Sequence, residues 1–183
     1  MLMGTSSKEL AQKLRKLAKR QHGCFTAAQA IDTGYADSVH LYHVKNGEWI
    51  RVFRGIYRFA DVPETFSARC MAALLWTRDK NGKIQGFLVA ETAAAIRSDA
   101  LSDLHSVQVG VPKGFRRSSD VPEGIELSFL SPGAHKTLKI DGLFVQEGLE
   151  TPSADVQTAP AGLDAPDYYD WLDYQAVLCS KTS

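Results

Sequence analysis

The segment Tyr42-His-Val-Lys-Asn-Gly-Glu-Trp-Ile-Arg-Val-Phe-Arg-Gly-Ile-Tyr-Arg58 decides how the first third of the chain is expected to fold. It begins within a short predicted helix that Asp37 or Ser38 can cap, and Gly47 can adopt the left-handed conformation just after that helix. The following residues are basic, β-branched and aromatic, which predicts two strands joined by a turn at Arg54-Gly55: Ile50–Phe53 and Ile56–Phe59. The segment therefore predicts a helix followed directly by a cationic hairpin.

Two further helices are predicted before this segment. Leucine recurs at helical spacing within residues 8–21, and Gly23 ends that pattern. Thr26-Ala-Ala-Gln29 has the spacing of a capping box and predicts a second helix that ends near Thr33-Gly34. Short helices joined by a glycine-containing turn form a helix-turn-helix, and the hairpin completes a winged helix-turn-helix. We therefore expect this fold over residues 1–61.

A winged helix-turn-helix predicts where duplex DNA would bind. The second helix of the motif lies in the major groove, which assigns that role to residues 37–46. Its candidate exposed face comprises Ser38, Leu41, Tyr42 and Lys45. The hairpin supplies candidate phosphate contacts in Arg51, Arg54 and Arg58, with Lys19 or Arg20 assisting. Because each neutralised phosphate releases counterions, such binding is expected to weaken steeply with salt.

The distribution of charge favours a polyanionic partner for this region. The chain has 183 residues, 44% hydrophobic and 23% charged, with a formal net charge of zero. Residues 1–60 nevertheless hold ten Lys and Arg against four Asp and Glu, so the remainder has an equal excess of acids. A chance division of solvated charges, or a helical subdomain that binds protein, is the alternative. The three arginines of the hairpin favour DNA.

The rest of the chain predicts a small mixed α/β domain over residues 62–150, so the whole chain is expected to be α+β. Pro63 marks the boundary, and Asp141-Gly142 has the composition of a type I′ hairpin turn. Helices are predicted at Phe66–Trp76 and Glu91–Arg97. A turn at residues 80–83 leads to the first of the predicted strands, which are Gln85–Val89, Ser106–Val111, Ile125–Leu130, Thr137–Ile140 and Leu143–Gln146.

The last segment, residues 151–183, differs in composition. It contains prolines and few large apolar residues at its start, which predicts a loop, and Asp167–Leu178 can form a terminal helix with an aromatic side. From Asp141 to the end there are eight acids and one lysine. We expect an acidic tail, either solvated or able to mimic or repel nucleic acid.

No residue pattern predicts catalysis, a cofactor or a metal site. The three cysteines are scattered, which favours a reducing cytosol over a disulfide framework, and Cys24 is expected to pack as a small apolar residue. His40 and His43 could share a metal, but no cysteine or carboxylate pair completes such a site. We expect one of these histidines to pack and the other to contact a groove or phosphate. No apolar run is long enough for a membrane span, and no secretory signal is expected.

Several short stretches together resemble one protein family. In the first domain they are Gly23-Cys-Phe-Thr-Ala-Ala-Gln-Ala30, Gly34-Tyr35, Tyr42-His-Val-Lys-Asn-Gly-Glu-Trp49 and Arg54-Gly-Ile-Tyr-Arg58. In the second they are Leu75-Trp76, Gly86-Phe87, Glu91-Thr-Ala-Ala94, Leu101-Ser-Asp103, Val109-Gly-Val-Pro112 and Phe115-Arg-Arg117. Over residues 8–150 their order and spacing resemble AbiEi-family antitoxins of bacterial type IV toxin–antitoxin systems.

The resemblance implies a specific function. The N-terminal winged helix would bind double-stranded DNA at inverted repeats in its own promoter, where it could act as a dimer, and repress the operon. The C-terminal domain would antagonise a nucleotidyltransferase-like toxin without a stable complex. The sequence departs from the family at Ala90, where a histidine is expected, and after Thr151, where the usual helical ending is missing. The alternatives are an orphan winged-helix regulator and a protein-interaction module without antitoxin activity.

Overall fold

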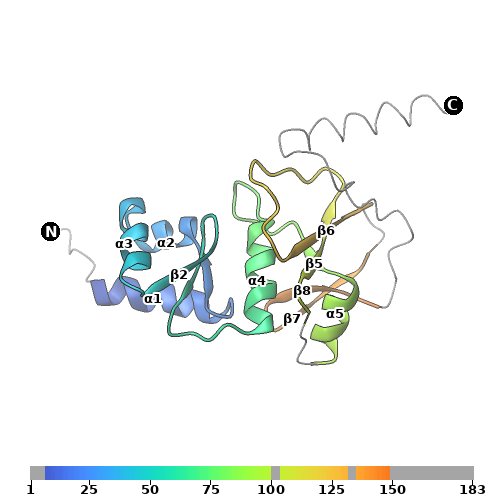
Figure 1. The fold of residues 1–183 in the computed structure, drawn as a ribbon, viewed down its shortest axis with the longest axis horizontal. Coiled ribbons are helices and arrows are strands. Elements are labelled where there is room, and N and C mark those ends of the chain that lie inside the picture. Colours follow the sequence, from blue (N-terminus) through green and yellow to red (C-terminus); the bar gives the residue numbers. More distant parts are fainter. Residues whose placement is uncertain (1–6, 100–103, 132–134, 149–183) are drawn as a thin grey trace.

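A computed structural model describes residues 7–99, 104–131 and 135–148 of the chain. The described residues form helices α1–α5 and two sheets, so the fold is mixed α+β, as expected. Figure 1 shows two parts: a head of residues 7–62, with most of the helices, and a body of residues 63–148, with the larger sheet. The predicted tail at 151–183 lies outside the described residues.

The head contains every element that the sequence predicts there, together with one additional strand. Its elements are α1 (Ser7–Lys19), β1 (Cys24–Thr26), α2 (Ala27–Thr33), η1 (Asp37–Val39), α3 (His40–Lys45), β2 (Trp49–Phe53) and β3 (Ile56–Phe59). The short strand β1 was not predicted, because three residues are too few to show an alternating pattern. It pairs antiparallel with β3, which also pairs with β2, giving the order β1-β3-β2.

The predicted start and end of α2 are confirmed. The Thr26 side chain accepts a hydrogen bond from the Gln29 amide at 3.1 Å, and the Gln29 side chain accepts one from the Thr26 amide at 2.9 Å. The helix ends at Gly34, whose φ of 114° is strained for other residues. A Cβ at Gly34 would also lie 2.8 Å from the Leu10 side chain, so α1 can pack closely against this turn.

The third helix begins differently from the prediction. Residues 37–39 form a single 3₁₀ turn, and α3 follows it directly. Neither the 3₁₀ turn nor α3 has a side-chain hydrogen bond at its N-cap, so the predicted cap at Asp37 or Ser38 is wrong. The Asp37 carboxylate instead lies 3.5 Å from Nδ1 of His40. The predicted end is confirmed: Asn46 follows the last helical residue, and Gly47 has a φ of 73°.

The body consists of helix α4 and a five-stranded sheet with α5 on its other side. Its elements are α4 (Phe66–Trp76), β4 (Phe87–Leu88), α5 (Ala90–Arg97), β5 (Val107–Pro112), β6 (Ile125–Leu130), β7 (Thr137–Ile140) and β8 (Leu143–Gln146). The strand order is β6-β5-β4-β8-β7, with parallel pairs β5–β6 and β4–β8. The predicted hairpin turn is confirmed, because Asp141 and Gly142 both have positive φ.

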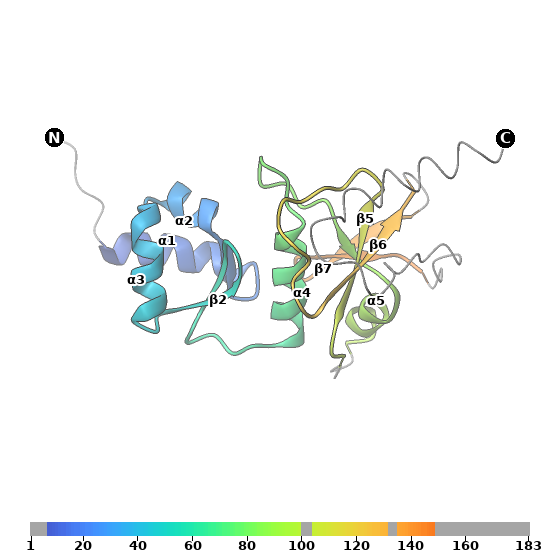
Figure 2. The same ribbon diagram turned by 45° about the horizontal axis from the view of Figure 1, so that its top comes forward.

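Helix α4 lies between the head and the sheet of the body (Figures 1 and 2). Residues on every side of this helix are buried, including Cys70, Met71, Leu74 and Trp76. A helix that is apolar all round requires apolar neighbours on more than one side. The strands of the head supply one side and β4, β5 and β8 supply the other.

The two sides of the head sheet therefore have different neighbours. Successive residues of a strand point to opposite faces. Phe25, Tyr57 and Phe59 face the head helices in one apolar cluster with Leu14 and Trp49. Cys24 and Ile56 belong instead to the cluster that contains α4 and the body sheet. Both faces of this small sheet are thus covered.

Polar contacts also join the head to the body at separate points. Nε2 of His22 lies 2.8 Å from the backbone oxygen of Asp141, in the turn between β7 and β8. The Arg78 guanidinium donates to the Gly55 carbonyl at 3.4 Å, at the tip of the head hairpin. Each of these contacts joins a residue before the predicted domain boundary at Pro63 to a residue after it. Among the described residues no helix is both long and apolar enough to cross a membrane.

We predict that Cys24 and Cys70 resist alkylation in the native protein. Both thiols are buried, and burial raises the pKa of each to about 12, so almost no reactive thiolate is present at neutral pH. Peptide mass spectrometry after native treatment with iodoacetamide measures this, and the urea-unfolded protein is the control. Native alkylation of either residue at the unfolded rate would contradict the packing described here.

Candidate nucleic-acid interface

The candidate interface begins with the packing that holds α3 on the head sheet. Trp49, the first residue of β2, is only 3% exposed. The ring of His43 stacks on it, with centroids 4.5 Å apart, and Tyr35 meets it edge-on at 5.2 Å. His40 also approaches the Trp49 ring, at 5.6 Å. The inner face of α3 is therefore fixed by aromatic contacts.

The outer face of α3 displays the four residues that the sequence assigns to the groove. Leu41 and Tyr42 are 61% and 59% exposed, and Ser38 and Lys45 are also exposed. Their spacing places them on the side of the helix opposite His40 and Val44. The Tyr42 ring meets His43 edge-on, with centroids 5.6 Å apart, yet most of the Tyr42 and Leu41 side-chain surface is exposed. The structure thus brings Ser38, Leu41, Tyr42 and Lys45 together on one accessible surface.

The three hairpin arginines do not share one environment. Arg51 on β2 and Arg54 at the turn are exposed. Arg58 on β3 is only 6% exposed, and its guanidinium donates to the Val62 carbonyl and to the Glu64 carboxylate, the latter at 3.3 Å. The expectation that Arg58 serves a phosphate does not fit this position.

The cause is the alternation of β3. Tyr57 and Phe59 must face the head helices, so Arg58 and Ile56 face α4. The sequence alone could not indicate that this second face of the hairpin is covered by another helix.

Lys19 and Arg20 lie at the end of α1 that approaches the body. Lys19 is the last residue of the helix, and the backbone oxygen of Arg20 is 3.0 Å from where a Cβ at Gly142 would stand. Helix α3 lies toward the other end of the head (Figures 1 and 2). The structure therefore does not place these two exposed cations beside the outer face of α3.

Part of the head matches a known protein family. Residues 12–60 match the family model of AbiEi antitoxins, described as transcriptional regulators. No curated protein matches the chain. The family of AbiEi antitoxins is the one that the sequence resembles. The AbiEi-matched segment, residues 12–60, spans most of α1 and all of the head sheet. Every candidate DNA-binding residue lies within it.

Two of the three histidines in the AbiEi-matched segment, His40 and His43, have different surroundings. His40 is 3% exposed, and its Nε2 has no hydrogen-bond partner among the described residues. Burial lowers its pKa, although the nearby Asp37 acts in the opposite direction. His43 is partly buried, stacks on Trp49 and pairs with Glu48. His40 is thus the packing residue, and His43 positions α3.

Metal binding has no support in the described part of the chain. No group of three or more His, Cys, Asp or Glu side chains among these residues could hold a metal ion. His40 faces the sheet, and His43 is engaged by Glu48. The residues that sequence analysis overlooked are Tyr35 and Trp49, which position α3. Both residues are aromatic, and this was the sequence feature that could have indicated their packing against α3.

We predict that Arg58→Ala destabilises the fold, whereas Arg51→Ala leaves stability nearly unchanged. The substitution removes hydrogen bonds from a buried charged donor, each of which contributes about 1.5–3 kcal/mol. Urea unfolding measured by circular dichroism gives the free energy of unfolding of each variant. Equal stability of Arg58→Ala and the parent protein would show that the guanidinium is not held as described.

We also predict that His40 makes the fold less stable in mild acid. Its folded-state pKa lies below the ordinary 6.5, so the unfolded chain binds a proton that the folded chain does not. Stability should therefore be complete above about pH 6.5 and should fall as the pH drops below it. Thermal unfolding at about pH 7.5 and about pH 5.5 tests this. His40→Phe should lose less stability over this range, and an equal loss would contradict the assignment.

Proposed function

We propose that the protein is a DNA-binding transcriptional autorepressor and antitoxin of a bacterial type IV toxin–antitoxin system, without catalytic activity. One observation carries the proposal. The segment that matches the AbiEi regulators also displays an exposed helix face, formed by Ser38, Leu41, Tyr42 and Lys45, directly before a hairpin with two exposed arginines. Neither the match nor the surface alone would support so specific a function.

The architecture of the head supports a winged helix-turn-helix. The helix pair α2 and α3 is followed by the hairpin β2–β3, and α3 packs on β2. In such a motif the second helix enters the major groove. The face of α3 with Leu41 and Tyr42 would meet base edges and thymine methyl groups, and Lys45 would meet bases or phosphate.

Arg51 and Arg54 are the proposed phosphate contacts of the hairpin. Both are exposed cations without an ion pair in the described residues, whereas Arg15 is paired with Asp61 and Arg58 with Glu64. Phosphate contacts set the register of a protein on the duplex and carry little sequence information. The proposed set therefore excludes Arg58 and keeps Lys19 and Arg20 only as peripheral contacts.

The remaining parts of the proposal rest on the family. Inverted repeats in its own promoter would match two copies related by a two-fold axis, each with one α3 in a groove. The body would antagonise a nucleotidyltransferase-like toxin without a stable complex. The free, buried thiols of Cys24 and Cys70 support action in a reducing cytosol.

One observation favours a second function. Leu41 and Tyr42 are large apolar side chains exposed next to each other, as in a surface that docks protein. If α3 docks a protein, binding should depend little on salt. If α3 binds DNA, binding should weaken steeply as the salt concentration rises. Neutralisation of Arg51 and Arg54 should separate the two functions, since only protein docking would survive it.

We predict that Arg54→Ala weakens binding to all duplex sequences about equally and lowers the salt slope by roughly 0.9, the value for one phosphate contact. Mobility-shift titrations with the protein's own upstream DNA and an unrelated duplex, at several salt concentrations, measure both effects. Lys136→Ala is the matched control, because this exposed lysine lies at the opposite end of β7 from the head contact. An unchanged slope for Arg54→Ala would count against the proposed interface.

A further inference from the structure

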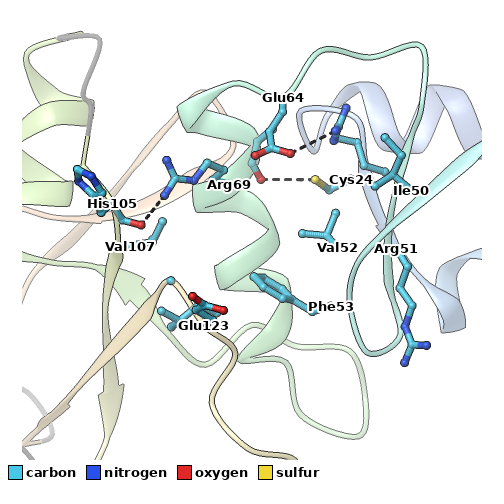
Figure 3. A pocket seen from close by; sticks show the side chains of 14 residues that line it. Cys24, Ile50, Arg51, Val52, Phe53, Glu64, Arg69, His105, Val107 and Glu123 are labelled. Carbon is cyan, nitrogen blue, oxygen red and sulfur yellow. Dashed lines mark hydrogen bonds and ion pairs between the residues drawn. The ribbon is translucent and has the colours of Figure 1, made fainter.

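A cleft of about 490 Å³ lies between the head hairpin and the body. Figure 3 shows β2, with Ile50, Val52 and Phe53, on one side and the body residues His105, Val107 and Glu123 on the other. Helix α4 contributes Ala68 and Arg69 to the lining. This volume is within the range of sites for small organic ligands.

The interior of the cleft combines apolar walls with buried positive charge. Val52, Phe53, Val107 and Ile125 are buried or half-buried and supply the apolar surface. Arg58 and the half-buried Arg69 supply two guanidinium groups, and the exposed Arg51 also lines the cleft. The carboxylates of Glu64 and Glu123 also line the cleft, but both residues are exposed, so water screens their charges.

Arg58 is incompletely satisfied in this position. Its side chain is more than nine-tenths buried, and two of its nitrogens donate to Val62 and Glu64. Its Nε has no hydrogen-bond partner among the described residues. A buried cationic donor without an acceptor costs free energy, and an anion in the adjoining cleft would supply the missing acceptor and countercharge.

Arg69 lies on the next element and provides a second anchor. One of its nitrogens donates to the His105 carbonyl at 2.8 Å, which holds the side chain across the cleft toward the body (Figure 3). Arg97 of α5, by contrast, donates to the Gln146 carbonyl, outside the lining of this cleft. Arg58 of β3 and Arg69 of α4 therefore both line this partly apolar cleft.

We propose that this cleft binds a small amphiphilic anion: a carboxylate that pairs with Arg58 and Arg69, attached to an aliphatic or aromatic group that packs on Val52, Phe53, Val107 and Ile125. A neutral molecule of the same shape would supply no countercharge for the two guanidinium groups. A polyanion such as a nucleotide would meet the two exposed carboxylates at the opening. Among the proposed DNA contacts Arg51 also lines the cleft, but Arg58 and Arg69 are not proposed to contact DNA, so either proposal can fail while the other stands.

The experiment uses the full chain with 4-phenylbutyrate as the probe and 4-phenylbutanol as its neutral match. A ¹H–¹⁵N correlation spectrum is titrated with each compound. We expect saturable shifts at amides of β2, of α4 near Arg69 and of residues 105–107, and binding of the alcohol about tenfold weaker, the factor of one charge-assisted hydrogen bond.

Two variants make the result specific. Arg69→Gln should weaken binding of phenylbutyrate about tenfold, whereas Arg97→Gln, a half-buried arginine that also donates to a carbonyl, should not change it. Val52→Phe should reduce binding by filling the cleft, and the dispersion of each spectrum shows that the variant is folded. No saturable binding, shifts outside the cleft, equal binding of the alcohol, or an unaffected Arg69→Gln would each overturn the proposal.

Discussion

Burial of both faces of the small sheet β1-β3-β2 is the constraint on which the rest of the structure depends. One face packs Phe25, Tyr57 and Phe59 against the head helices, and the other packs Cys24 and Ile56 against α4. Fully burying a large apolar side chain contributes about 1.5–3 kcal/mol to the free energy of unfolding, so exposing either face of the sheet would strongly destabilise the fold. A sheet this short would be marginal alone, and α4 supplies the second layer that it requires.

This double burial also determines the chemistry available at the surface. The alternation that turns Tyr57 inward turns Arg58 toward α4, where it pairs with Glu64 instead of facing solvent. Arg51 and Arg54 remain exposed and are the cations that the hairpin can offer to phosphate. The same geometry creates the cleft beside Arg58. The strand register therefore places Arg58 in the proposed anion site and leaves Arg54 at the exposed turn for DNA, while Arg51 also lines the cleft.

Much of this fold was predictable from local sequence signals. The capping box at Thr26, Gly47 and Asp141-Gly142 act within a few residues, and the structure confirms the elements that they delimit. Strand β1 and the burial of Arg58 were not predictable, because both depend on partners distant in sequence: β3 for the former and α4 for the latter. The outer face of α3 was predictable from helical spacing, whereas the first turn of that helix was not, since Asp37 pairs with His40 instead of capping.

The central claim is that the head and the body unfold together because they share α4. Trp49 lies in the head cluster and Trp76 in the body cluster, and both are almost fully buried. The most direct test labels the three tryptophans of the chain with 5-fluorotryptophan. The native ¹⁹F resonances of Trp49 and Trp76, assigned from Trp49→Phe and Trp76→Phe samples, are followed through a urea titration. The shared packing predicts that both resonances disappear with the same midpoint. Loss of the Trp49 resonance at clearly lower urea than that of Trp76 would contradict it.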